Sequence, residues 1–100
     1  MAFEIRFKDA QLEKLEKSTK YDGAYQVGIG TIFRKRMQLI RDAADERDFY
    51  AMKSLHYEKL KGKREHQRSM KLNDQWRLII EIVEGNPNKI VWLVGIEDYH

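Results

Sequence analysis

The fold of this chain is decided by Trp76-Arg-Leu-Ile-Ile-Glu-Ile-Val83, the turn Gly85-Asn-Pro-Asn88 and Ile90-Val-Trp-Leu-Val-Gly-Ile96. In the first stretch, apolar residues occupy every second position from Leu78 to Ile82, which predicts a strand with an apolar face. The last stretch is apolar on both faces, so it is expected to be a central strand. The tight turn between them predicts an antiparallel pair.

The residues just before this pair extend the same pattern. Arg68-Ser-Met-Lys-Leu72 alternates with a period of two and predicts a further strand, and Asn73-Asp74 predicts the turn that follows it. Trp76 and Trp92 are large apolar residues of predicted strands, so both are expected in the core. The second half of the chain is therefore predicted to be an antiparallel meander.

The first half of the chain carries helical spacing. Phe3-Glu-Ile-Arg-Phe7 predicts a short strand, and Asp9 can cap a helix that follows it. A longer helix is expected from about Thr31, and a short one from Asp45-Glu-Arg-Asp48 to Met52. Helices followed by a meander indicate an α+β fold with the helices on one face of the sheet. No linker interrupts the pattern, so residues 1–100 are predicted to form a single domain.

Composition narrows the class of protein. The chain has 100 residues and no cysteine, which excludes disulfides and thiolate metal sites and fits the cytoplasm. It has no apolar run of the ~18 residues that a membrane span needs, and its N-terminus does not resemble a secretory signal. The net charge is +3, and Lys and Arg are concentrated between Arg34 and Arg77. This distribution fits contact with phosphate groups or with an acidic partner.

Few types of chemistry are open to these residues. The three histidines form no metal-ligand pair at helical spacing, and no P-loop or GxGxxG is present, so neither a metal nor a cofactor is expected. Cations do lie on or beside the predicted meander. A metal-free ribonuclease needs such cations to stabilise a phosphorane, and groups such as histidine to transfer protons. The spacing leaves a simpler interpretation open, in which Arg77 pairs with Glu81 on the same strand face.

Three motifs in combination resemble a known family. Glu58-Lys-Leu-Lys-Gly-Lys-Arg64, Ser69-Met-Lys-Leu-Asn-Asp-Gln-Trp-Arg-Leu78 and Asp98-Tyr-His100 are similar to the HigB branch of the RelE/ParE toxins. The resemblance implies an N-terminal strand and two to three helices packed on a curved antiparallel sheet, as in microbial ribonucleases. It also implies a metal-independent endoribonuclease that cuts messenger RNA in the ribosomal A site. The expected partner is a helix-turn-helix antitoxin of the HigA type, through which the toxin reaches operator DNA.

The resemblance also assigns roles to residues. Lys61 and Arg77 match cations that contact the scissile phosphate. Asp98 and His100 match groups that take part in proton transfer or its orientation, and Tyr99 matches a residue that holds or stacks on a base. Further cations are expected to contact RNA through its phosphates, and these are Arg34, Lys35, Arg64, Arg68 and Lys71.

One position departs from the family pattern. Some members carry a functional histidine two residues before the leucine of Leu-Lys-Gly, where this chain has Glu58, with His56 two residues earlier. His56 takes that role, Glu58 replaces it, or the role is absent; we include His56 among the candidate catalytic residues. A non-enzymatic alternative also exists, since related toxins inhibit DNA gyrase and others serve only as antitoxin-binding co-repressors. The Asp98-Tyr-His100 triplet favours the nuclease, because the gyrase-directed branch is not expected to carry it.

Overall fold

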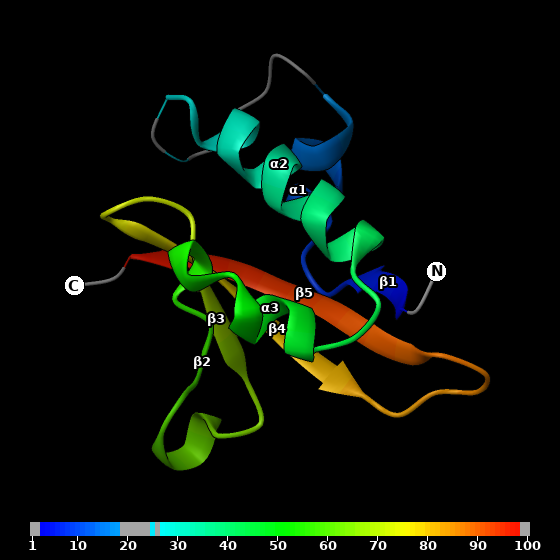
Figure 1. Ribbon diagram of the computed structural model, residues 1–100. Helices are drawn as coiled ribbons and strands as arrows, with labels where there is room; N and C mark the ends of the chain where they lie inside the picture. The colour runs from blue at the N-terminus through cyan, green and yellow to red at the C-terminus, as the bar shows by residue number, and fades with distance from the viewer. Residues whose placement is uncertain (1–2, 19–24, 26, 99–100) are drawn as a thin grey trace.

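A five-stranded mixed sheet forms the centre of the computed structural model, which describes residues 3–18, 25 and 27–98 (Figure 1). The strand order is β1-β5-β4-β3-β2. Strands β3, β4 and β5 form the predicted antiparallel meander. The sequence did not predict β2, which pairs antiparallel with β3, and β1 pairs parallel with β5. The strands are β1 (Phe3–Phe7), β2 (Glu58–Lys59), β3 (Arg68–Lys71), β4 (Trp76–Val83) and β5 (Lys89–Asp98).

Three α-helices precede the meander, and local features of the chain mark where the first two begin. Helix α1 (Ala10–Lys17) begins after Asp9, whose carboxylate accepts a hydrogen bond from the Gln11 amide at 2.9 Å, as predicted. Helix α2 (Ile29–Asp42) begins two residues earlier than expected, because Gly28 adopts a left-handed conformation with φ 92° just before it. Helix α3 (Arg47–Ala51) ends before Met52, which the sequence placed inside the helix and which is 43% exposed.

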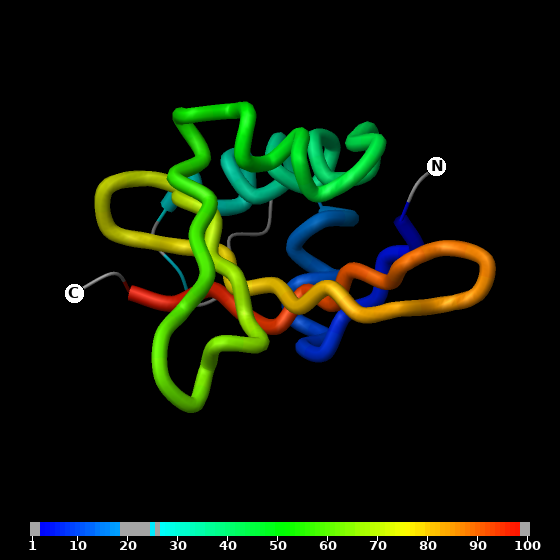
Figure 2. The backbone as a smooth tube through the Cα atoms, turned by 60° about the horizontal axis from the view of Figure 1, so that its bottom comes forward, coloured from blue at the N-terminus to red at the C-terminus, as the bar shows by residue number. Residues whose placement is uncertain are grey.

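The hydrophobic core lies between the helices and one face of the sheet. Figures 1 and 2 show α1 and α2 on the same side of the sheet, which confirms the predicted α+β arrangement. The apolar face of β4 is the predicted one, and the largest buried side chains from the two layers include Leu12, Leu15, Phe33, Met37, Leu78, Ile80 and Leu93. Among the described residues, no helix is long and apolar enough to cross a membrane.

A β-bulge changes the register halfway along β4 and β5. Ile79 lies opposite Gly95, but the next residue, Ile80, lies opposite Leu93, so Val94 is the extra residue. In β5, odd-numbered residues before the bulge and even-numbered residues after it therefore point to the same face of the sheet. As a result Trp92 and Glu97 both lie on the side of the sheet away from the helices, which we call the outer face.

The two tryptophans lie in different environments. Trp76 packs against the core, as predicted, and meets Tyr25 edge to face. The prediction for Trp92 is wrong, because its neighbours Val91 and Leu93 point into the core and alternation turns Trp92 to the outer face. There its ring is partly exposed. A strand that is apolar on both faces does not reveal which face the core covers.

Candidate active site

Arg77 is a nearly buried cation on the outer face of β4. It is 8% exposed, and its Nε donates a hydrogen bond to Oγ of the fully buried Ser69 on β3 at 3.0 Å. Its Nη2 donates to the backbone oxygen of His56 at 2.6 Å and lies 3.6 Å from Oε1 of Glu58. Because these contacts involve different nitrogens, they restrain both the position and the plane of the guanidinium.

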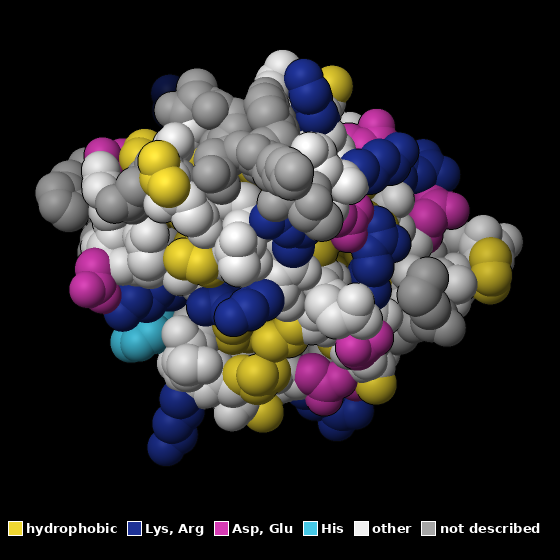
Figure 3. All heavy atoms as spheres, turned by 90° about the horizontal axis from the view of Figure 1, so that it is seen from above, with side chains coloured by type: hydrophobic (Ala, Val, Ile, Leu, Met, Phe, Trp, Pro, Cys, Tyr) yellow, Lys and Arg dark blue, Asp and Glu magenta, His cyan; other side chains and the backbone are white. Residues whose placement is uncertain are grey.

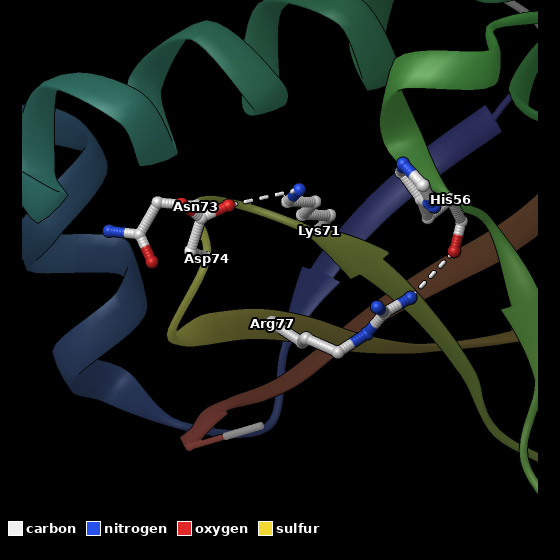
Figure 4. A pocket seen from close by; sticks show the side chains of 5 residues that line it. All are labelled: His56, Lys71, Asn73, Asp74 and Arg77. Atoms are coloured by element: carbon white, nitrogen blue, oxygen red, sulfur yellow. Dashed lines mark hydrogen bonds and ion pairs between the residues drawn. The ribbon is translucent and has the colours of Figure 1, made fainter. Parts of the chain in front are cut away.

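Two cavities meet at Arg77. The first has a volume of about 170 Å³ and is lined by His56, Lys71, Asn73, Asp74 and Arg77 (Figure 4). The second has a volume of about 200 Å³ and is lined by Glu58, Leu60, Arg64, Ser69, Arg77, Ile79, Glu97 and Asp98. One fixed guanidinium therefore faces two adjoining hollows on the outer face.

In the first cavity, His56 contributes both its backbone and its side chain. Its backbone is in the left-handed region, with φ 45°, which is uncommon for a residue other than glycine. Figure 4 shows the His56 carbonyl directed at Arg77 and the imidazole directed away from it. Across the cavity, Lys71 Nζ lies 3.2 Å from Oδ1 of Asp74. Lys71, paired with Asp74, and His56 thus lie in the same cavity beside Arg77.

In the second cavity, Arg64 and Glu97 form a two-pronged ion pair. Arg64 Nη1 and Nη2 lie 2.9 and 2.6 Å from the two carboxylate oxygens of Glu97. Glu97 is the β5 residue directly opposite Arg77. Asp98 follows it and accepts a hydrogen bond from Gln75 at 3.3 Å. The pair brings a second guanidinium from the β2–β3 loop, residues 60–67, to the cavity that Arg77 lines.

Glu81 holds the other end of the β2–β3 loop. Its two carboxylate oxygens accept hydrogen bonds from Lys8 and Gln67, both at 2.9 Å. Burial acts to raise the pKa of Glu81, but these hydrogen bonds and the nearby charges outweigh burial and lower it. Nε2 of the exposed His66 lies 3.7 Å from Oε2 of Glu81. Arg77 and Glu81 thus have separate partners, and the simpler pairing suggested by the sequence is not the arrangement observed.

Comparison with known proteins identifies the family. A family model for the RelE-like toxin of the type II toxin–antitoxin system HigB matches residues 5–96. This chain is a HigB-like toxin. Such a toxin implies an antitoxin as its partner. No curated protein matches the chain.

Solved structures share the fold of this HigB-like toxin at low sequence identity. The YoeB/ParE toxin from Agrobacterium tumefaciens superposes with a TM-score of 0.62 and 12% identity, over 98% of this chain and 100% of that chain. YafQ from E. coli also gives a TM-score of 0.62 with 12% identity, and the match covers 97% of this chain and 93% of YafQ. A conserved hypothetical protein from Helicobacter pylori gives a TM-score of 0.51 with 13% identity, and the match covers 97% of this chain and 94% of that chain.

The fold of the HigB-like toxin brings only part of the predicted site together. His56, Arg64, Lys71, Arg77 and Asp98 line the two cavities. Lys61 is exposed at the start of the 3-10 turn Gly62–Arg64 and lines neither cavity. Tyr99 and His100 lie outside the described residues.

Three of the cations predicted to bind RNA lie elsewhere. Arg34 donates hydrogen bonds to the backbone oxygens of Leu15 and Ser18, at 3.1 and 2.6 Å, and so satisfies the end of α1. Lys35 is exposed on α2. Arg68 lies opposite the core residue Ile80 and pairs with Glu46 at 3.3 Å. Figure 3 shows that basic and acidic side chains are interspersed on the helix side of the molecule.

Two residues of the site were missed from the sequence. Ser69 is a small polar residue in an alternating strand, and only the register that pairs β3 with β4 shows that it reaches Arg77. Glu97 is opposite Arg77 because of the bulge, which the sequence pattern does not announce.

Proposed function

We propose that this HigB-like toxin is a metal-independent endoribonuclease that cuts messenger RNA in the ribosomal A site and thereby inhibits translation. One observation carries the proposal. Arg77 is a nearly buried guanidinium, restrained by Ser69 and by the His56 backbone, at the junction of two cavities. A fixed, desolvated cation on a concave surface suits a reaction in which negative charge builds on phosphorus.

The reaction is a transfer within the RNA backbone. The 2′-oxygen attacks the adjacent phosphorus, and the 5′-oxygen of the next nucleotide leaves once a proton reaches it. The oxygens of the intermediate carry extra negative charge. Arg77 stabilises that charge, assisted by Lys71 in the first cavity and by Arg64 in the second.

Glu58 is better placed than His56 to remove the proton of the 2′-hydroxyl. Its carboxylate lies 3.6 Å from Arg77 Nη2 and lines the second cavity. The imidazole of His56 is directed away from the guanidinium (Figure 4). We therefore assign proton removal to Glu58 and a supporting role to His56. The family resemblance gives Asp98 and His100 a part in proton transfer or its orientation. It gives base holding to Tyr99 and phosphate contact to Lys61.

The ribosome and an antitoxin complete the proposal. The cavities are small and open, so RNA must be held in place by a larger structure for the 2′-oxygen and the phosphorus to align. The A site supplies that alignment and places the reaction in the cytoplasm. The antitoxin is proposed to be a HigA-like helix-turn-helix protein that also brings the toxin to operator DNA.

Mapping new 5′ ends in cellular transcripts after induction tests this function. We expect cuts with the wild-type toxin, and a loss of about 100-fold or more in Arg77→Met, which removes the charge and both hydrogen bonds. Arg47→Met is the matched control, since Arg47 is 91% exposed and paired only with Asp45 among the contacts described. Cuts that persist unchanged in Arg77→Met and in His100→Ala contradict the proposal. The proposal is also contradicted if the toxin inhibits growth and gyrase supercoiling while the transcripts remain intact.

A further inference from the structure

A second set of aromatic, apolar and cationic side chains lies on the outer face, at the other end of the sheet from Asp98. Ile90 lies opposite Val83, which is 40% exposed, and Trp92 lies opposite Glu81 on one side and Arg6 on the other. Trp92 and Ile90 are half-buried. We call Val83, Ile90 and Trp92, with the cations Arg6 and Lys8, the Trp92 patch. None of these residues lines the two cavities at Arg77.

Both cations of the patch lie at the indole ring. The guanidinium carbon of Arg6 and Nζ of Lys8 are each 5.7 Å from the ring centroid of Trp92. Each cation also has a carboxylate partner, Glu4 at 2.6 Å for Arg6 and Glu81 at 2.9 Å for Lys8. The carboxylates keep the cations over the ring and leave the patch close to neutral. An aromatic ring flanked by cations is the combination that binds a base and its phosphate.

A hollow beside the patch offers hydrogen-bonding groups of the right kind. Its volume is about 180 Å³, and it is lined by Glu4, Arg6, Asn86, Pro87, Asn88 and Ile90. Arg6 and Ile90 belong to both the hollow and the patch. Side-chain amides donate and accept hydrogen bonds at once, which matches the mixed edge of a nucleobase.

The patch and Arg77 share one face of the same strands. Trp92 lies opposite Glu81, which is four residues beyond Arg77 on β4, a separation of about 13 Å along the strand. A single strand of RNA with one phosphate at Arg77 can therefore extend along the outer face to the patch. The negative charge of Glu81, beside Trp92, is balanced by Lys8, and its second carboxylate oxygen accepts a hydrogen bond from Gln67.

We propose that the Trp92 patch is a second RNA-binding site, which stacks and holds a base of the strand whose scissile phosphate lies at Arg77. The inference rests on the proposed function and extends it from the cut to the flanking nucleotides. RNA is favoured over a protein partner because cations lie over the ring, amides line the adjoining hollow, and the patch faces the same way as Arg77.

Binding to a non-cleavable RNA tests the patch apart from catalysis. The probe is a fluorescently labelled 2′-O-methyl oligouridylate, which has no free 2′-hydroxyl, and the readout is fluorescence anisotropy. We expect Trp92→Leu to weaken binding about fivefold or more, as loss of one stacked base does. Arg6→Gln should weaken it as well while leaving the ring in place.

Two controls make the result specific. Lys17→Gln removes an exposed cation that pairs with Glu13 at 3.5 Å, so it matches Arg6→Gln in charge but lies on α1; it should bind as the wild type does. Thermal unfolding should show that Trp92→Leu is folded, since the ring lies outside the core.

The outcomes separate this inference from the function it rests on. Wild-type affinity in both Trp92→Leu and Arg6→Gln overturns the inference even if transcripts are still cut. Weakened binding of the purified antitoxin, with unchanged RNA binding, also overturns it and assigns the patch to a protein interface. Loss of RNA binding in these variants supports it, and transcripts left intact by the wild-type toxin would then contradict only the cleavage.

Discussion

Ser69→Ala should damage the candidate active site without removing any charged group. Ser69 is fully buried on β3, and its Oγ accepts the hydrogen bond from Arg77 Nε at 3.0 Å. In the variant that N–H faces a methyl group in a nearly dry environment. Because the guanidinium keeps its charge, the substitution separates the orientation of Arg77 from its presence.

The size of the effect follows from the burial of both partners. A hydrogen bond to a charged group contributes about 1.5–3 kcal/mol, and a buried donor left without a partner loses most of that. For a domain of this size, a loss of that order lowers the melting temperature by roughly 10 °C. The contacts with the His56 carbonyl and with Glu58 remain, but both are made through Nη2, so the guanidinium can pivot about that end. A displacement of about 1 Å at a reacting group can reduce the rate about 100-fold.

Two measurements on the same variant check this reasoning. Thermal unfolding followed by circular dichroism gives the stability, and 5′-end mapping well below the melting temperature gives the cleavage. Ser54→Ala, at an exposed position, is the control for the substitution itself. A melting temperature equal to that of the wild type would refute the energetic argument. A clear drop in stability with undiminished cleavage would show that Ser69 does not position Arg77 for the reaction.

Three further predictions concern neighbouring contacts. Glu97→Gln should change the free energy of unfolding by less than about 1 kcal/mol, since the side chains of Glu97 and Arg64 are each 45% exposed. It should still lower RNA cleavage measurably. A loss of cleavage that only follows a loss of stability would point to a structural role for Glu97. The pKa of Glu81 is lowered because its hydrogen bonds outweigh burial, so its contribution to stability is present above about pH 4.3 and is lost as the pH falls through the folded value. Glu81→Gln should therefore unfold with a weaker pH dependence in that acidic range, measured by urea titrations at several pH values; an unchanged slope would contradict this. Tyr57→Phe should lower the free energy of unfolding by about 1 kcal/mol, because the Tyr57 hydroxyl donates a hydrogen bond to Glu46 at 2.7 Å. Burial holds the Tyr57 pKa well above its usual range, so the substitution should leave the ultraviolet absorbance change of tyrosine ionisation at alkaline pH unaltered.

The sequence predicts individual helices and strands well, because their patterns and caps lie within a few neighbouring residues. Strand β4 has the predicted ends and the predicted apolar face, and Asp9 caps α1 as its position suggested. Pairing between distant segments leaves no such signal. The parallel contact of β1 with β5 joins the two ends of the chain, and β2 has two residues, too few to show alternation.

The sequence predicted the kind of candidate site but only some of the residues that form it. Arg77 was found by motif, and the register explains why it is held, through Ser69, which no motif marks. Arg34 has the same composition signal as Arg77 but satisfies backbone oxygens at the end of α1. A cation in a sequence does not reveal whether its partners are substrate atoms or the protein's own carbonyls, because only tertiary packing decides which atoms it reaches.

The extra residue Val94 has a consequence for how this domain tolerates length changes. It divides β5 into two segments, each with its own phase, so that Trp92 and Glu97 are displayed together despite their opposite parity. Deleting Val94 would restore a regular ladder in which Ile80 still lies opposite Leu93 and Ile79 still lies opposite Gly95, so the other side chains would keep their faces. The deletion would remove the local bend and extra twist of the bulge, and so change the angle between the two ends of the outer face. Loss of this one residue is therefore expected to be tolerated nearly as well as a change of length at the hairpin tip, residues 84–88.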